Sequence, residues 1–88
     1  MDVDFIDHAR ERMQTRGASL EEVRQTILEG APVPAKAGRE ATERVFPYNG
    51  TWQGRRYQQK KVRAVYVRDG DRAVVITVFV YYGSWGDA

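Results

Sequence analysis

The sequence predicts an α+β fold in which two N-terminal helices pack on one face of a three- to four-stranded antiparallel sheet. Residues 5–30 repeat apolar side chains at helical spacing and contain signals that start and stop helices. Residues 43–82 are rich in β-branched and aromatic residues and are divided by turn signals. Helices that precede a meander of strands pack together on one side of the sheet, which defines the α+β class.

With 88 residues, the chain is expected to form a single domain over residues 1–88, with one small core. The chain contains no cysteine and one histidine, so it has no disulfide, no cysteine nucleophile and no cysteine-ligated metal. No apolar run reaches the roughly 18 residues of a membrane span. The N-terminus lacks the basic and apolar regions of a secretory signal. We therefore expect a cytoplasmic protein with no membrane partner.

The first helix is predicted from three apolar residues at four-residue spacing, which places them on one face: Phe5, Ala9 and Met13. Asp4 or Asp7 is the expected N-cap, because a short carboxylate accepts hydrogen bonds from first-turn amides. Gly17 is expected to end this helix in a left-handed conformation.

The second helix is predicted to begin at Ser19, which forms a capping box with Glu22. Its apolar stripe consists of Leu20, Val23 and Ile27. Gly30 is the expected end, and the prolines at positions 32 and 34 prevent continuation. The prediction treats residues 31–42 as a loop.

The first strand is predicted over Glu43–Tyr48, at an edge because it contains Pro47. Asn49-Gly50 is the expected hairpin turn, and residues 52–57 stay unassigned. The clearest element is a long hairpin that joins residues 59–68 to residues 72–82 around a three-residue loop, residues 69–71.

The register of this hairpin follows from its apolar face. A three-residue loop places Tyr66 opposite Val74 and keeps one face apolar, whereas a one-residue slip places Arg63 opposite Ile76. The residues expected beneath the helices are Tyr66, Val74, Ile76 and Val78. Those expected on the opposite face are Lys61, Arg63, Thr77 and Tyr81.

The net charge of +2 conceals a basic segment, because residues 55–72 carry seven basic and two acidic side chains. A local balance of +5 indicates an anionic partner, although basic residues that shield a sheet edge give the same pattern. Aromatic residues interleaved with cations also suit RNA binding by base stacking. The RNA-binding candidates in this segment are Arg55, Arg56, Lys60 and Lys61.

Two groups of residues have side chains suited to catalysis. His8, Arg12 and Arg16 follow one another at four-residue steps and line one helix face. A histidine transfers protons near neutral pH and arginines hold phosphate, although exposed side chains with no chemical role would show the same spacing. On the sheet, Arg63 and a hydroxyl donor would stabilise developing charge. The catalytic candidates are therefore His8, Arg12, Arg16, Arg63, Thr77 and Tyr81. The sequence shows no metal-ligand cluster and no glycine-rich phosphate loop, so we expect no metal and no cofactor.

The opening pattern also resembles a known family. The pattern His8-Ala9-x-x-Arg12-Met13-x-x-Arg16-Gly17, followed by Ser19-Leu20-Glu21-Glu22-Val23 and Ile27-Leu28-Glu29-Gly30, resembles the domain-of-unknown-function family 4258. The segment Val74-Val75-Ile76-Thr77-Val78 is similar to the ending of that family. Its members are similar to RelE-like and BrnT-like toxins. The resemblance implies a RelE-like toxin fold, RNA cleavage without metal, and a cognate antitoxin protein as partner.

Carried over by position, the resemblance implies that His8, Arg12, Arg16 and Thr77 are site residues. Either Arg63 or Lys61 would be the basic strand residue, and Tyr81 is loosely similar to the C-terminal tyrosine of RelE-like toxins. We therefore expect a toxin-like endoribonuclease in which a ribose 2′-hydroxyl attacks the adjacent phosphorus and His8 moves a proton.

Two other functions remain open at the level of sequence. The chain could be an RNA-binding module without catalysis, or a protein–protein adaptor that pairs its C-terminal strand, as a sheet edge, with a partner. The end of the chain, residues 83–88, is expected to be a flexible tail.

Overall fold

The computed structural model describes residues 1–86. In chain order its elements are β1 (Asp2–Phe5), α1 (Asp7–Arg16), α2 (Leu20–Glu29), β2 (Ala31–Val33), β3 (Glu40–Trp52), β4 (Arg55–Asp69) and β5 (Arg72–Gly83). The strands form one sheet in the order β1-β5-β4-β3-β2. β1 runs parallel to β5, and the other neighbouring strands are antiparallel.

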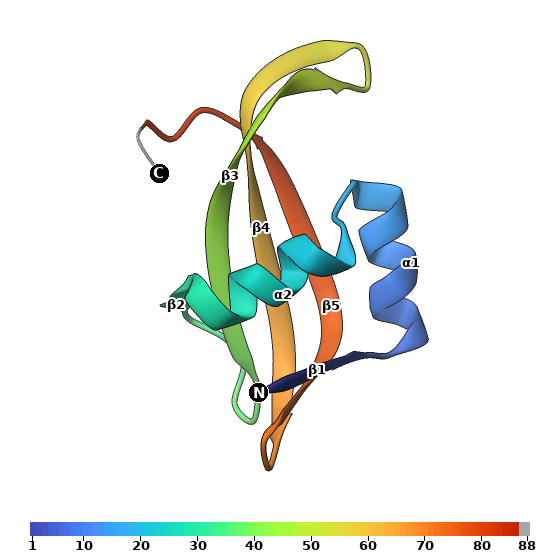
Figure 1. The fold of residues 1–88 in the computed structure, drawn as a ribbon, viewed down its shortest axis with the longest axis vertical. Helices are drawn as coiled ribbons and strands as arrows, with labels where there is room; N and C mark the ends of the chain where they lie inside the picture. The colour runs from blue at the N-terminus through green and yellow to red at the C-terminus, as the bar shows by residue number, and fades with distance from the viewer. Residues whose placement is uncertain (87–88) are drawn as a thin grey trace.

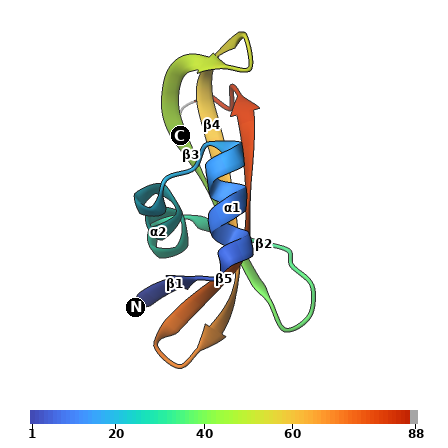
Figure 2. The same ribbon diagram turned by 90° about the vertical axis from the view of Figure 1, so that its right-hand side faces the viewer.

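α2 crosses one face of the sheet over β3 and β4, and α1 lies alongside β5 (Figure 1). Viewed from the side, the loop between β2 and β3 projects beyond the face opposite α2 (Figure 2). Within residues 1–86, no helix has the length and apolar character that crossing a membrane requires. The α+β class with two helices on a sheet is confirmed. The predicted sheet was too small, because it lacked the short strands β1 and β2, and β1 makes the sheet mixed rather than wholly antiparallel.

β1 and β2 escape prediction because each is too short to show a clear period. Val3 is the buried residue of the four-residue β1, and Phe5 belongs to that strand rather than to α1. β2 pairs Ala31 with Glu43 and Val33 with Ala41. The loop predicted over residues 31–42 is therefore wrong at both ends. Pro32 fits in β2 because an edge strand needs no N–H from it.

α1 begins at Asp7 after Ile6, the N-cap residue, which has an extended backbone and contributes no side-chain cap. The prediction that Asp4 or Asp7 caps this helix is therefore wrong. Ala9 and Met13 are buried as predicted, and Gly17 ends the helix at φ 85°.

The capping box of α2 is confirmed. The Ser19 hydroxyl accepts from the Glu22 backbone N–H at 3.1 Å, and the Glu22 carboxylate accepts from the Ser19 N–H at 2.9 Å. Val23 and Ile27 are buried, whereas Leu20 at the first position is exposed. The apolar stripe therefore starts one turn later than predicted.

β3 extends past Asn49-Gly50, which is not the hairpin turn. Asn49 has φ 48° and lies where the pairing of β3 with β4 shifts register. The turn is Gln53-Gly54, with φ 49° and 81°, as in a type I′ hairpin. Asn49 and Gln53 both have positive φ. Asn-Gly is the more favoured turn dipeptide, but here Asn49-Gly50 marks the shift in strand pairing and Gln53-Gly54 forms the turn.

The register predicted for the β4–β5 hairpin is wrong. Asp69 pairs with Arg72, so the turn has two residues, Gly70-Asp71. A bulge then shifts the register between Val65 and Tyr66. A bulge places one extra residue in one strand and changes which side chains of that strand reach a given face.

The bulge decides which residues of β5 are buried. Tyr66 and Val78 lie beneath the helices as predicted, but Ala73 and Val75 take the places expected for Val74 and Ile76. Because three apolar residues follow one another here, the sequence does not distinguish the two patterns.

Among the described residues, β1 pairs only with residues 72–75 of β5, so the second half of this strand, residues 76–83, has β4 on one side and no strand on the other. After β5, the chain returns against β4. The Trp85 N–H donates to the Gln59 side chain, and the amide of Gln59 donates to the Gly86 carbonyl at 2.6 Å. Of the tail predicted to be flexible, residues 83–86 have these defined positions, and residues 87–88 lie outside the described residues.

The distal part of the β3–β4 hairpin, residues 48–57, forms an arm that curls over the end of α1 (Figure 1). Trp52 stacks on Tyr82 with 4.8 Å between ring centroids, and Tyr48 and Tyr57 also contact this ring. The Tyr82 hydroxyl donates to the Arg16 carbonyl at 2.8 Å. Burial, with smaller contributions from Tyr48 and Glu22, raises the pKa of Tyr82 to about 12. The protonated phenol therefore stabilises the fold below pH 10, and this contribution is lost as the pH rises through 12.

The Gly17→Ala substitution tests this packing. A methyl group at this position would meet the Tyr82 hydroxyl and, at 3.0 Å, the Trp52 ring, in addition to the strain at φ 85°. Gly38→Ala is a matched control, because Gly38 has φ 82° with no atom within 4 Å of the added methyl. We expect Gly38→Ala to lower the free energy of unfolding by about 1 kcal/mol and Gly17→Ala to lower it at least twice as much in urea denaturation. Equal losses would show that the arm does not press on the helix junction.

Candidate functional site

The face of the sheet opposite α2, here called the open face, is built from three cross-strand rows. Each row takes one residue from β3, one from β4 and one from β5, and the partners are opposite one another in the register. The rows are Ala41, Val65 and Thr77; Glu43, Arg63 and Phe79; and Val45, Lys61 and Tyr81. The prediction that Arg63 and Thr77 face away from the helices is confirmed.

Arg63 is the best-positioned cation of the open face. Its Nε donates to the Glu43 carboxylate at 2.8 Å, and its Nη2 donates to the same oxygen. The guanidinium lies over the Tyr81 ring, 5.3 Å from the centroid. Lys61 lies 3.8 Å from the other oxygen of Glu43. Because one carboxylate serves two cations, the two adjacent rows together keep one positive charge while Arg63 is held in place.

Arg16 reaches the open face from α1. Its Nη1 donates to the Val78 carbonyl of β5 at 2.7 Å, and its guanidinium packs over the Phe79 ring at 4.9 Å. Phe79 is the register partner of Arg63. The two arginines, which are 47 positions apart in the chain, therefore pack on two aromatic residues of the same face of β5, Arg16 on Phe79 and Arg63 on Tyr81.

His8 and Arg12 remain on the outer surface of α1, and both are exposed. With a rise of about 1.5 Å per residue, His8 lies roughly 12 Å along the helix axis from Arg16. The structure therefore brings together Arg16, Arg63, Thr77, Tyr81 and Lys61, but leaves the other two helix candidates beside this cluster rather than within it.

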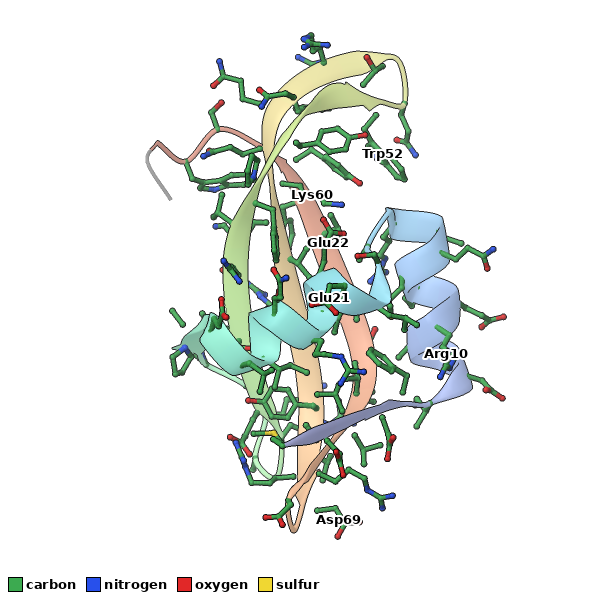
Figure 3. All side chains as sticks on the ribbon, in the orientation of Figure 1. Arg10, Glu21, Glu22, Trp52, Lys60 and Asp69 are labelled. Carbon is green, nitrogen blue, oxygen red and sulfur yellow. The ribbon has the colours of Figure 1, made fainter. Side chains whose placement is uncertain are left out.

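Lys60 and Lys61 point to opposite faces of β4. The Lys60 side chain lies on the helix side, where only 7% of the residue is exposed. Its ammonium group donates to the Gly17 carbonyl and to the Glu22 carboxylate, both at 2.8 Å, and Figure 3 shows it directed toward Glu22. Its donors are thus engaged in joining the sheet to the helices, which removes Lys60 from the RNA-binding candidates.

Arg55 and Arg56 are exposed at the start of β4, at the tip of the hairpin arm. Arg63 follows Arg55 by eight positions along the strand, about 26 Å if the strand were straight. These two arginines form a basic tip that is separate from the cluster at the centre of the open face.

A groove of about 500 Å³ lies beside this cluster. Its floor consists of Ala41, Val65, Thr77 and Phe79, and its rim carries Lys36, Arg39 and Arg63. Lys36 and Arg39 were not among the predicted site residues, because residues 31–42 were expected to be a plain connection. Two cations three positions apart in that loop were the available signal.

Sequence analysis also missed Glu43 and Phe79, which are register partners of Arg63 on opposite sides. The alternation Thr77, Phe79, Tyr81 was visible in the sequence, but the face to which it belongs depends on the bulge. Among residues 1–86, no three His, Cys, Asp or Glu side chains lie close enough together to hold a metal ion.

A family model described as a domain of unknown function (DUF4258) matches residues 5–80. Because this match covers most of the chain, the protein belongs to that family, as the resemblance in the sequence implied. Neither the curated proteins nor the solved structures contain a match to the chain.

Two lysine variants test the division between the faces of β4. Lys60→Met leaves the half-buried Glu22 carboxylate without its cation, and we expect the free energy of unfolding to fall by about 2 kcal/mol or more. Lys61→Met is the matched control, because Glu43 keeps Arg63 as partner; a loss of less than about 1 kcal/mol is expected. The measurement is urea denaturation at pH 7. A larger loss for Lys61→Met than for Lys60→Met would contradict this assignment.

Proposed function

We propose that this protein is a small toxin-like endoribonuclease that binds RNA on its open face and cleaves it without a metal ion. The observation that carries the proposal is that Arg16 packs on Phe79 and Arg63 on Tyr81, two neighbouring aromatic residues of the open face, with Lys61 as the register partner of Tyr81. RNA presents phosphates that arginines bind in pairs and bases that stack on aromatic rings.

The charge of the face supports an anionic substrate. Glu43 is the one acidic residue in the three rows, and it faces two cations there. Arg16 spends one N–H on the Val78 carbonyl, which leaves other guanidinium donors for a phosphate. An RNA strand laid over the rows therefore meets a surplus of positive charge.

The proposed reaction is transesterification within the RNA. A ribose 2′-oxygen forms a bond to the adjacent phosphorus while the bond from phosphorus to the 5′-oxygen breaks, giving a 2′,3′-cyclic phosphate and a 5′-hydroxyl. Arg16 and Arg63 stabilise the extra negative charge on the phosphorane. The hydroxyl of Thr77 or Tyr81 donates a hydrogen bond to a phosphoryl oxygen.

Two groups are suited to take the proton from the 2′-hydroxyl. Histidine side chains often act as general bases, but His8 lies beside the cluster. Glu43 lies within the cluster as a carboxylate whose side chain is 15% exposed. The base then releases this proton to the 5′-oxygen, which completes the reaction.

The toxin class also implies an antitoxin protein, and this partner remains part of the proposal. An antitoxin that neutralises the activity would cover the open face. The adaptor function has less support, because α1 packs against β5 and Arg16 already donates to the Val78 carbonyl on its outer side.

Cleavage is tested on mixed RNA in EDTA, with the products analysed for cyclic phosphate ends. We expect Arg63→Ala to reduce the rate at least 100-fold and Arg24→Ala, an exposed change on α2, to leave it unchanged. Either His8→Gln or Glu43→Gln, whichever removes the group that carries the proton, should lower the cleavage rate about 100- to 10,000-fold while RNA affinity persists. If wild-type protein binds RNA but leaves it intact, the protein is a binding module and the catalytic proposal fails.

Binding to the open face is tested through its salt dependence. Each lost phosphate contact should reduce the slope of log K against log salt by about 0.7 on single-stranded RNA. We expect Lys61→Ala with Arg63→Ala to reduce it by roughly 1.4. The pair Arg10→Ala with Arg24→Ala removes the same charge from the helices and should leave the slope unchanged. Equal slopes for the two double variants would remove the open face from the RNA contact.

A further inference from the structure

The groove beside the cluster has a composition that phosphate binding alone does not explain. Its floor is apolar apart from one hydroxyl, with Ala41 and Val65 from the sheet and Phe79 at the side. A phosphate finds one hydroxyl donor on this floor and otherwise apolar side chains, whereas a flat, largely apolar ring contacts most of the floor favourably. The volume of about 500 Å³ lies in the range of small-ligand sites, roughly 300–1,000 Å³.

The rim of the groove carries cations on two sides. Lys36 and Arg39 come from the loop between β2 and β3, and Arg63 comes from β4. The backbone N–H of Arg39 donates to the Lys36 carbonyl at 3.0 Å, which closes a turn with Gly38 at φ 82°. The loop that contains this turn lies on the side of the sheet opposite α2 (Figure 2).

Phe79 connects the groove to the cluster that binds the scissile phosphate. Arg16 packs over its ring and Arg63 is its register partner, so the ring is held in place on the boundary between the two. Because Arg63 and Phe79 also line the groove, a ligand in it lies directly against the proposed reaction centre.

We propose that the groove is a subsite for one unpaired nucleotide. The subsite rests on the proposed function, and it makes single-stranded RNA the substrate class. The base lies on the floor formed by Ala41, Val65 and Thr77, against Phe79. The phosphate on one side of this nucleotide contacts Lys36 and Arg39, and the phosphate on the other side contacts Arg63. A base that is paired within a duplex is not available to enter the groove, so duplex RNA binds only through its backbone.

The test uses the ¹⁵N-labelled protein and two small probes, adenosine 5′-monophosphate and ribose 5-phosphate. We expect the nucleotide to shift the amide signals of Ala41, Val65 and Thr77 in a saturable way, with at least 10-fold weaker binding of ribose 5-phosphate. Lys36→Ala with Arg39→Ala should weaken nucleotide binding at least 10-fold. The matched pair Arg10→Ala with Arg24→Ala should leave it unchanged.

Equal binding of both probes would overturn the base subsite and leave a phosphate site only. Absence of any shift at these three amides would overturn it as well, and RNA cleavage by the same sample would show that the proposed function stands without it. Nucleotide binding in the groove by a protein that neither binds nor cleaves RNA would support the subsite and refute the proposed function.

As a further measurement, the Lys36 and Arg39 double variant should lose at least 10-fold more affinity for a single-stranded oligonucleotide than for a duplex. Equal losses would contradict the proposal.

Discussion

The bulge between β4 and β5 is the constraint on which both faces of the sheet depend. Near the turn, Ala73 and Val75 point to the core. Strict alternation would then send residues 77, 79 and 81 to the core as well. The shift in register instead turns Val78, Val80 and Tyr82 toward the helices, and it leaves Thr77, Phe79 and Tyr81 on the open face. One extra residue therefore divides β5 into a first half that contributes Ala73 and Val75 to the core and a second half that presents Thr77, Phe79 and Tyr81 on the open face.

The same shift explains how the helices are attached. Tyr82 reaches the helix side, where its hydroxyl meets the carbonyl of Arg16. Lys60, its register partner, bonds the Gly17 carbonyl and the Glu22 carboxylate. Neighbouring residues of β4 and β5 thus hold the junction between α1 and α2 from below. Because this junction is held, the side chain of Arg16 can turn around the edge of β5 to the open face.

The two faces handle charge in different ways. On the helix side, a single buried lysine has its donors engaged by a carboxylate and a carbonyl, which is what a low-dielectric environment requires. On the open face, Glu43 is shared by Arg63 and Lys61, and solvent reaches the remaining donors. The basic character of residues 55–72 is therefore not one surface. It divides into a structural lysine, a cluster at the centre of the open face, and a tip at the end of the hairpin arm.

The sequence by itself determined the features that depend on neighbours in the chain. The capping box of α2, the left-handed end of α1 at Gly17, and the combination of two helices with a long hairpin all follow from local stereochemistry. The family pattern around His8 and Arg16 was also readable. Only the tertiary structure decided the strands β1 and β2, the bulge, and the approach of Arg16 to Phe79. These depend on pairing between distant segments, where apolar runs such as Val74–Ile76 satisfy more than one register and the whole core selects among them.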